Sequence, residues 1–262
     1  YVLINNIDDV YKMKIDGKEC ELNNLYTFDT IGEHEVEFLF GHTIPKEAFY
    51  ENNLITEVEI YDNIAEIGEE AFENCINLTS ITFSDSVKKI NEYAFRFCYG
   101  LKNIVIPDSV ISIGNSAFFE CTSLTSVTIG NGVTSIGNSA FISCSGLTEI
   151  VIPKSVIGIG KYAFYNCNGL TSVTIGNGVT NIGEYAFASC EGLTEIVIPD
   201  SVTSIGNRAF SDCVGITNLY IPYSVNNISG NIVRGCVNIN NIVVSENNTT
   251  YDSRDNCNAI IK

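Results

Sequence analysis

Tryptophan is absent from this 262-residue sequence, methionine occurs once and histidine only twice. His34 and His42 both precede the repetitive part of the chain, so a histidine acid–base pair or a histidine-rich metal site has few residues to draw on. The motifs GxSxG, HExxH, the phosphate-binding P-loop and paired CxxC are missing too. We therefore predict that the protein is no enzyme and holds no catalytic residues, metal or cofactor.

Long apolar runs and positive charge are also scarce. No apolar run of about 18 residues occurs, which argues against insertion of this chain into a membrane. The formal net charge is −17, from 14 Lys and Arg against 31 Asp and Glu, and most of it lies in residues 1–75. Nucleic acids and anionic membrane surfaces attract Lys and Arg, so neither is expected as a partner. We interpret the acidity as a source of solubility rather than as an acidic docking patch.

What the sequence does contain is a repeat of 23 residues. LTSVTIGNGVTSIGNSAFISCSG, at 124–146, recurs with modest changes as eight full repeats from Ile55 to Asn238. A fixed period of this length predicts stacked repeats around one continuous core. Two columns that keep the step are Phe72, Phe95, Phe118, Phe141, Phe164, Phe187 and Phe210, and Cys75, Cys98, Cys121, Cys144, Cys167, Cys190, Cys213 and Cys236.

Each repeat begins with a strand pattern. Val127 and Ile129 alternate with polar residues, which predicts a short strand with one buried face. Equivalent strands of successive repeats are expected to pair as a parallel sheet. Asn131-Gly132 then predicts a turn that uses positive φ angles.

The second half of each repeat has a different spacing. Ala140, Phe141 and Cys144 have helical spacing, which predicts a single helical or 3-10 turn that buries one face. Gly137 recurs as glycine in most repeats and once as Asn91, which we attribute to a left-handed backbone conformation.

Eight of the ten cysteines occupy one repeat position. Equivalent side chains of stacked coils point the same way, whereas a disulfide needs converging Cβ atoms about 3.8 Å apart. The column therefore predicts a ladder of buried free thiols, which is typical of a reducing or anaerobic setting. Only Cys20 and Cys257 lie outside the ladder.

Three segments are expected along the chain. Residues 1–40 do not repeat and show alternating runs around Asp16-Gly17, which predicts a small antiparallel β N-terminal cap over the first coil. The solenoid follows at 41–244, with a degenerate half-repeat before the eight full repeats at 55–238. Residues 245–262 are either a C-terminal cap or the start of a further segment.

The repeat pattern Lxx(I/V)xI(P/G)xxVxxIGxxAFxxCxx, which spans most of the chain, resembles the BspA-like bacterial leucine-rich repeats. The resemblance implies a right-handed repeat solenoid of the α/β class. It implies a curved parallel β-sheet on one face and short helical or 3-10 turns on the other. Members of that family are mostly secreted or cell-surface proteins associated with adhesion, so an extracellular or bacterial cell-surface location is implied as well.

A binding site, if there is one, is expected on the outward positions of the sheet, which line the concave face of such a solenoid. The candidates are Glu149, Val151, Glu195, Val197, Val105 and Tyr220. Their apolar and acidic character suits a basic protein segment. A glycan is less suited, because Tyr220 is the only aromatic residue in these columns. Valine is also common at outward strand positions because of its β propensity, so a purely structural role of these valines stays open.

Two functions remain as hypotheses. The first is a monomeric, non-enzymatic adhesion module that binds a protein partner, such as a host matrix or cell-surface protein. The second is a structural spacer that presents another domain and has no ligand of its own. A separate column that directly follows the buried phenylalanines (Phe119, Ile142 and Tyr165) either offers lateral contact to a partner or covers neighbouring coils.

Overall fold

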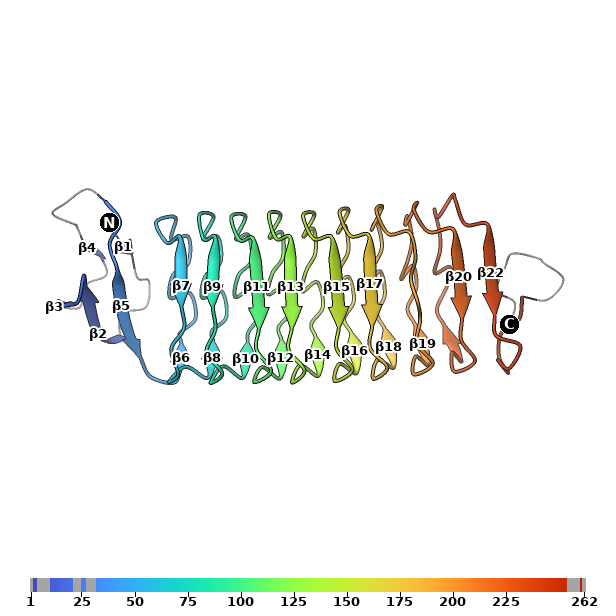
Figure 1. Ribbon diagram of the computed structural model, residues 1–262, viewed down its shortest axis with the longest axis horizontal. Helices are drawn as coiled ribbons and strands as arrows, with labels where there is room; N and C mark the ends of the chain where they lie inside the picture. Colours follow the sequence, from blue (N-terminus) through green and yellow to red (C-terminus); the bar gives the residue numbers. More distant parts are fainter. Residues whose placement is uncertain (1, 4–9, 21–24, 27–31, 254–259, 261–262) are drawn as a thin grey trace.

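The computed structural model describes residues 2–3, 10–20, 25–26, 32–253 and 260. The chain winds into a parallel β-solenoid, with antiparallel strands at its N-terminal end (Figure 1). Every regular element among the described residues is a strand. The predicted solenoid of stacked coils is confirmed, and its coils have three hydrogen-bonded sides.

The first side, which we call the long-strand face, contains the predicted strands. Its outward and buried residues alternate, and equivalent residues pair in parallel one repeat apart, as Val105 does with Thr128 and Val151 with Thr174. Residues 195–198 keep the same alternation without being assigned as a strand. The strands are β7 (Glu57–Glu59), β9 (Ser80–Thr82), β11 (Asn103–Ile106), β13 (Ser126–Ile129), β15 (Glu149–Ile152), β17 (Ser172–Ile175), β20 (Asn218–Ile221) and β22 (Asn241–Val244).

The second side is a nine-stranded parallel sheet of two-residue strands, which the sequence did not predict. Each strand ends in an isoleucine that points into the core, as Ile136 does. We call it the short-strand face. It consists of β6 (Thr43–Ile44), β8 (Glu66–Ile67), β10 (Lys89–Ile90), β12 (Ser112–Ile113), β14 (Ser135–Ile136), β16 (Gly158–Ile159), β18 (Asn181–Ile182), β19 (Ser204–Ile205) and β21 (Asn227–Ile228).

The third side, which we call the tight-turn face, comprises residues 138–144 and their equivalents. The predicted helical or 3-10 turn is wrong here, and with it the α/β class, because no helix occurs in the part of the chain that the structure describes. Ser139 and Ser143 have φ angles of 60° and 56°, and these two repeat positions have positive φ from coil to coil. A left-handed residue every few positions interrupts helical winding, so consecutive tight turns form instead.

The tight turns are hydrogen-bonded to the next coil rather than within a helix. The N–H groups of Ser139, Phe141 and Ser143 donate to the carbonyl oxygens of Lys161, Ala163 and Tyr165, at 2.7, 2.8 and 2.8 Å. The tight turns therefore form a ladder of their own along the solenoid. Because all three sides use inter-coil hydrogen bonds, the solenoid needs no helical layer to close its core.

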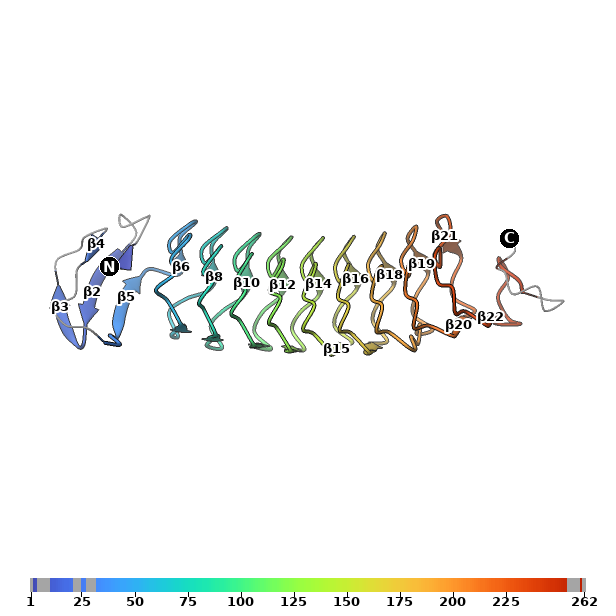
Figure 2. The same ribbon diagram turned by 90° about the horizontal axis from the view of Figure 1, so that it is seen from above.

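The stack is nearly straight rather than curved (Figures 1 and 2). Paired strands lie about 4.8 Å apart, whereas a helix is about 10 Å wide and would force the opposite side of each coil to spread. With strands or hydrogen-bonded turns on every side, both sides of the coil have similar spacing. The long-strand face is therefore close to flat.

The glycine columns have a different cause from the one we predicted. Neither Gly137 nor Gly132 has a positive φ angle. A Cβ atom at Gly137 would lie 2.6 Å from the carbonyl carbon and oxygen of Gly114, and one at Gly132 would lie 1.9 Å from the carbonyl oxygen of Asp108. These glycines allow the backbones of neighbouring coils to approach closely.

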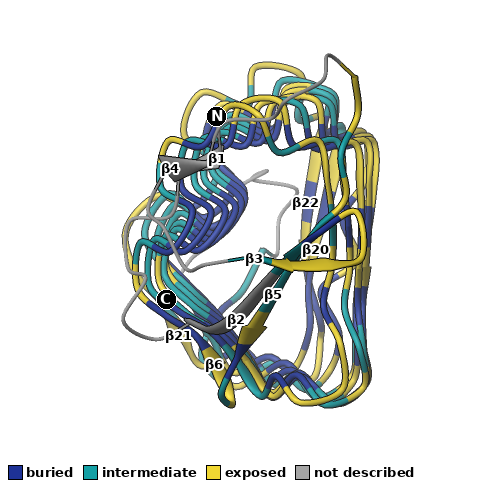
Figure 3. Ribbon diagram, turned by 90° about the vertical axis from the view of Figure 1, so that its left-hand side faces the viewer, coloured by how far each residue is buried: buried dark blue, intermediate teal, exposed yellow. Residues whose placement is uncertain are grey.

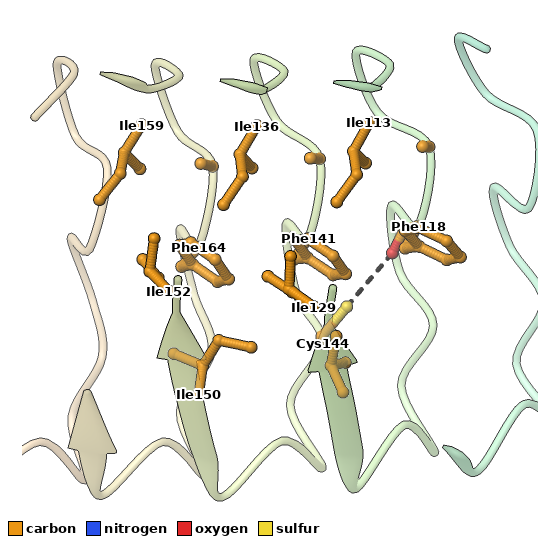
Figure 4. Close-up of a cluster of buried hydrophobic side chains, with 14 of the residues drawn as sticks. Ile113, Phe118, Ile129, Ile136, Phe141, Cys144, Ile150, Ile152, Ile159 and Phe164 are labelled. Carbon is orange, nitrogen blue, oxygen red and sulfur yellow. Dashed lines mark hydrogen bonds between the residues drawn. The ribbon is translucent and has the colours of Figure 1, made fainter. Parts of the chain in front are cut away.

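The core is built of stacked ladders of side chains (Figure 4). The ring of Phe141 stacks on those of Phe118 and Phe164, with centroids 5.1 and 5.3 Å apart and interplanar angles of 9° and 3°. The thiol of Cys144 donates to the carbonyl oxygen of Phe118 at 3.2 Å, and the same contact recurs along the column. All nine described cysteines are free, as predicted, and Cys257 lies outside the described residues.

The N-terminal segment packs on the first coil. β2 (Val10–Ile15) pairs antiparallel with β3 (Lys18–Cys20) through a turn at Asp16 and Gly17, which have φ angles of 48° and 77°, and also with β5 (Val36–Phe40). A separate antiparallel pair joins β1 (Val2–Leu3) and β4 (Leu25–Tyr26).

The aromatic stack runs on into this segment. Phe38 and Phe40 contact Phe49 at ring-centroid distances of 5.4 and 5.9 Å, and Phe49 stacks on Phe72 at 5.0 Å. This continuous aromatic contact supports a capping role for the described part of residues 1–40.

At the other end, residues 245–253 complete the hydrogen bonds of the last coil. The Tyr251 hydroxyl accepts a hydrogen bond from the Ile228 N–H at 2.7 Å. The Asn248 side-chain amide donates to the carbonyl oxygens of Pro222 and Val225, both at 2.9 Å. These contacts support a capping role for the described part of this segment.

Candidate functional site

The apolar candidates lie on the long-strand face and point outward. Val105, Val151 and Val197 are 62%, 60% and 64% exposed, and Tyr220 is 49% exposed. Strand alternation sets this orientation, because the neighbouring Ile150 and Ile152 point into the core. Along the same outward column these side chains alternate with threonines, since Val105 pairs with Thr128 and Val151 with Thr174.

The structure gathers three of the six candidates around one shallow hollow of about 570 Å³. Glu195 and Val197 form one wall, and Tyr220 lies on the neighbouring coil. The hollow is lined further by Asn218, Asn241 and Val243. Its surface therefore combines an apolar floor, an aromatic ring, amide groups and one carboxylate.

The other candidates are spread along the same face. Val105 lines a second hollow of about 760 Å³ with Thr82, Thr128 and two carboxylates, Asp85 and Asp108. Both hollows thus have an apolar base beside acidic groups.

Between the hollows lie Glu149 and Val151, both exposed on β15. All six candidates are therefore arranged along the stack rather than around a single point. An extended partner that runs across successive strands fits this arrangement better than a small molecule.

The cysteine ladder offers no reactive thiol. Burial raises the pKa of Cys121 and of Cys167 to about 12, so both stay protonated at neutral pH. A thiol acts as a nucleophile or metal ligand only as the thiolate. The hydrogen bond from each thiol to a phenylalanine carbonyl gives the column a structural role instead.

Within the described ranges, no group of three or more His, Cys, Asp or Glu side chains is placed to hold a metal ion. Nor does this part of the chain form a helix long and apolar enough to cross a membrane.

A second surface with recognisable chemistry lies on the tight-turn face. The predicted lateral column of Phe119, Ile142 and Tyr165 is half-buried there. The sequence reasoning missed the neighbouring left-handed position, which carries Tyr162 and Tyr185 with rings stacked at 4.8 Å. The signal in the sequence was large aromatic residues recurring at 23-residue steps in a polar context.

Arginines complete this surface. The Arg96 guanidinium lies 4.5 Å from the ring centroid of Phe97, and its Nε is 3.7 Å from Glu73. Burial raises the pKa of Glu73, while the charge of Arg96 acts in the opposite direction. Arg208 donates a hydrogen bond to the Tyr185 hydroxyl and lies 5.5 Å from its ring centroid.

A model of a known protein family matches the repeat region. This family is described as the BspA type leucine-rich repeat region (6 copies), and its model matches residues 42–169 and 135–259 of the chain. No curated protein is detectably similar in sequence.

Three solved bacterial proteins are similar to the chain. A leucine-rich cell surface protein from Faecalibacterium prausnitzii is 31% identical over 77% of this chain and 62% of its own, with a TM-score of 0.51. A leucine-rich repeat protein from Eubacterium ventriosum is 29% identical over 58% of this chain and 41% of its own, with a TM-score of 0.56. The leucine-rich repeat protein of T. pallidum is 28% identical over 59% of this chain and 72% of its own, with a TM-score of 0.54.

Proposed function

Because the chain belongs to the BspA-type leucine-rich repeat family, we propose that it is a non-enzymatic binding module whose long-strand face holds a protein partner. The similar protein from Faecalibacterium prausnitzii is a leucine-rich cell surface protein, which supports a place for this chain at the bacterial surface or outside the cell. The chain spans 62% and 41% of the lengths of the first two similar proteins, so this role concerns the repeat region.

The observation that carries this proposal is the row of exposed apolar side chains beside carboxylates. Val151 and Val197 are 60% and 64% exposed, and each lies two residues from an exposed glutamate on the same outward face. The two glutamates, Glu149 and Glu195, are two coils apart, which corresponds to about 10 Å. Apolar contact supplies affinity and the carboxylates select positive charge.

The partner that fits best is an extended, basic segment of a protein, as found in host matrix or cell-surface proteins. Lysine and arginine side chains at about 10 Å spacing would reach both glutamates while the apolar parts of the segment cover the valines. A binding module of this kind mediates adhesion to the host or to neighbouring cells.

The alternative is a spacer that presents another part of the protein. The regular, nearly straight stack favours this role, because a rod of uniform coils sets a fixed distance (Figure 1). Threonine or serine in alternate coils, such as Thr128 and Ser172, gives much of the long-strand face no distinctive chemistry.

Binding measurements separate the two functions. The protein would be immobilised and exposed to purified host matrix and cell-surface proteins and to lysine-rich peptides. Saturable binding at micromolar concentration, weakened at high salt, supports the binding module. No saturable binding contradicts it and favours the spacer.

The site itself is tested with charge reversal. Glu149→Lys with Glu195→Lys is expected to weaken binding at least about tenfold, since both carboxylates then repel a basic partner. The matched control, Glu66→Lys with Glu191→Lys, makes the same change in net charge off the long-strand face and is expected to leave affinity unchanged. Equal affinity of both double variants would move the site away from Glu149 and Glu195.

A further inference from the structure

The tight-turn face changes in character from one end of the stack to the other. Its left-handed positions begin with two carboxylates, continue with aromatic and serine side chains, and end with a guanidinium. In chain order these residues are Glu47, Glu70, Tyr93, Ser116, Ser139, Tyr162, Tyr185 and Arg208. All of them are half-buried, so each presents part of its surface to solvent.

The middle of this face carries two apolar side chains among small polar ones, with the carboxylate of Glu120 beside them. Phe119 and Ile142 are half-buried on two successive coils, and Tyr165 follows on the third. Aromatic side chains and arginines are enriched at protein interfaces, because they bury much area and still offer a polar group. Ser116 and Ser139 lie on the coils of Phe119 and Ile142, and their small side chains leave room for close approach.

The order of charges selects one orientation for a second copy facing this surface. Glu47, Glu69 and Glu70 share one cation, Lys46, at 3.6, 3.1 and 3.8 Å. A two-fold axis along the stack would bring this net negative end against the same end of the other copy, which is repulsive. A two-fold axis across the stack makes the copies antiparallel. Arg208 then lies opposite Glu47 or Glu70, which are on adjacent coils about 4.8 Å apart.

The same antiparallel arrangement brings the middles of the two faces together, with Phe119 and Ile142 of one copy facing Ile142 and Phe119 of the other. We propose that this chain forms an antiparallel homodimer through its tight-turn face. By symmetry the ion pair to Arg208 forms twice, once at each end of the interface. This replaces the monomer that we expected from the sequence.

Like charges also meet in this arrangement, but most bring counter-charges with them. Glu69 faces Glu184 when Arg208 is opposite Glu47. Glu69 already lies 3.1 Å from Lys46, and Glu184 lies 3.6 Å from Lys161. Glu51 and Asp212, on the same end coils as Glu47 and Arg208, also meet, but both are exposed whereas Glu47 and Arg208 are half-buried, so water screens the repulsion more than the ion pair.

Dimerisation leaves the long-strand faces free. The tight turns lie on the side of the coil away from the long strands (Figure 3). An antiparallel pair would therefore expose two long-strand faces on opposite sides, an arrangement that suits the bridging of two separate partners rather than two contacts with one surface. The dimer itself does not depend on the proposed ligand.

Sedimentation equilibrium of the full chain tests the proposal at concentrations from about 1 to 200 µM, without any ligand. The wild type is expected to show a reversible monomer–dimer equilibrium. Arg208→Glu is expected to raise the dimer dissociation constant at least about tenfold, because two ion pairs become repulsive contacts. Arg208→Gln, which removes only the charge, should give a smaller shift in the same direction.

Rescue distinguishes the antiparallel pair from other contacts. Adding Glu47→Lys and Glu70→Lys to Arg208→Glu restores opposite charges only if the two ends of the face meet, so dimerisation should recover. The control Lys154→Glu has the same charge change as Arg208→Glu on an exposed turn elsewhere and should leave the equilibrium unchanged. Thermal melting of each variant checks that it is folded.

Three results would overturn the proposal. The first is a wild type that stays monomeric up to 200 µM. The second is a dimer that Arg208→Glu and Arg208→Gln both leave intact. The third is a folded Arg208→Glu variant that Glu47→Lys and Glu70→Lys fail to rescue.

Discussion

The long-strand face and the tight-turn face belong to the same coils, yet they join neighbouring coils through different backbone geometry. The long strands use ordinary extended conformations, and their hydrogen bonds follow the parallel register of a sheet. The tight turns use positive φ angles at Ser139 and Ser143, which cost a non-glycine residue about 1–2 kcal/mol each. Hydrogen bonds from both residues to the next coil offset that cost.

The two faces also differ in what they bury. Behind the tight turns lie the stacked phenylalanines and the cysteine ladder, whereas the long strands bury aliphatic side chains. In the described repeats, the buried thiols therefore lie on one side of the coil. Four experiments sharpen this difference, and we give them in order of decreasing expected effect.

Alkaline pH should act through the tight-turn side. Burial raises the pKa of the ladder thiols, to about 12 for Cys75, Cys121 and Cys167. Their stabilising contribution is complete below the unfolded-state pKa of about 8.5 and is lost as the pH rises toward 12. Each thiol costs about 1.4 kcal/mol per pH unit in that window, so the ladder costs on the order of 10 kcal/mol by pH 10.

Urea unfolding at pH 7, 9 and 10 measures this loss. Cys144→Ser keeps a hydrogen-bond donor that does not titrate in this window, so its unfolding free energy should fall less steeply with pH than that of the wild type. A free energy of unfolding that stays constant from pH 7 to 10 would contradict the assignment of the ladder as buried thiols.

Truncation of the aromatic stack should be the most costly single substitution. Phe141→Ala removes a fully buried ring that contacts two others, and we expect a loss of about 3–5 kcal/mol. Val127→Ala, on the buried side of a long strand in the same repeat, removes less volume and should cost less. Chemical denaturation of both variants gives the comparison, and a loss below about 1 kcal/mol for Phe141→Ala would exclude the stack from the core.

A methyl group at a close approach between coils should have an intermediate effect. Gly132→Ala places a Cβ 1.9 Å from the carbonyl oxygen of Asp108, and overpacking of this kind costs about 1–3 kcal/mol. Gly158→Ala is the matched control, because no atom lies within 4 Å of the added Cβ. Equal melting temperatures for the two variants would contradict close approach as the reason for glycine at position 132.

The smallest effect is expected at a left-handed position. Ser139→Gly relieves backbone strain but adds freedom to the unfolded chain, so the free energy of unfolding should change by less than about 1 kcal/mol. Ser139→Val should be clearly destabilising, because a β-branched side chain fits poorly at positive φ. If Ser139→Val is as stable as Ser139→Gly, the positive φ angle at this position is in doubt.

The sequence predicted the long-strand face well for a physical reason. Alternation such as that of Val127 and Ile129 translates directly into one buried and one outward side of a strand. The outward positions of Glu149, Val151 and Tyr220 therefore follow from the residue pattern alone. What they bind does not, because an exposed valine on a strand is compatible with both a site and plain β propensity.

The sequence predicted the tight-turn face less well, because the residue types found there do not indicate the φ angle of the backbone. Serine, tyrosine, glutamate and arginine all occupy the left-handed position, whereas the repeated glycines such as Gly132 and Gly137 have ordinary φ angles. Glycine marks both left-handed turns and close contacts, and the sequence does not distinguish the two. The two-residue strands, such as β14 (Ser135–Ile136), are too short for an alternating pattern to be seen.

Hydrogen–deuterium exchange of the protein with and without a bound basic peptide or matrix protein tests the central assignment most directly. We predict new protection at 195–198, which has no assigned strand, and in β20, which carries Tyr220. The tight-turn face should show no ligand-dependent change. Ligand-dependent protection confined to the tight-turn face would contradict the assignment of the long-strand face as the binding surface.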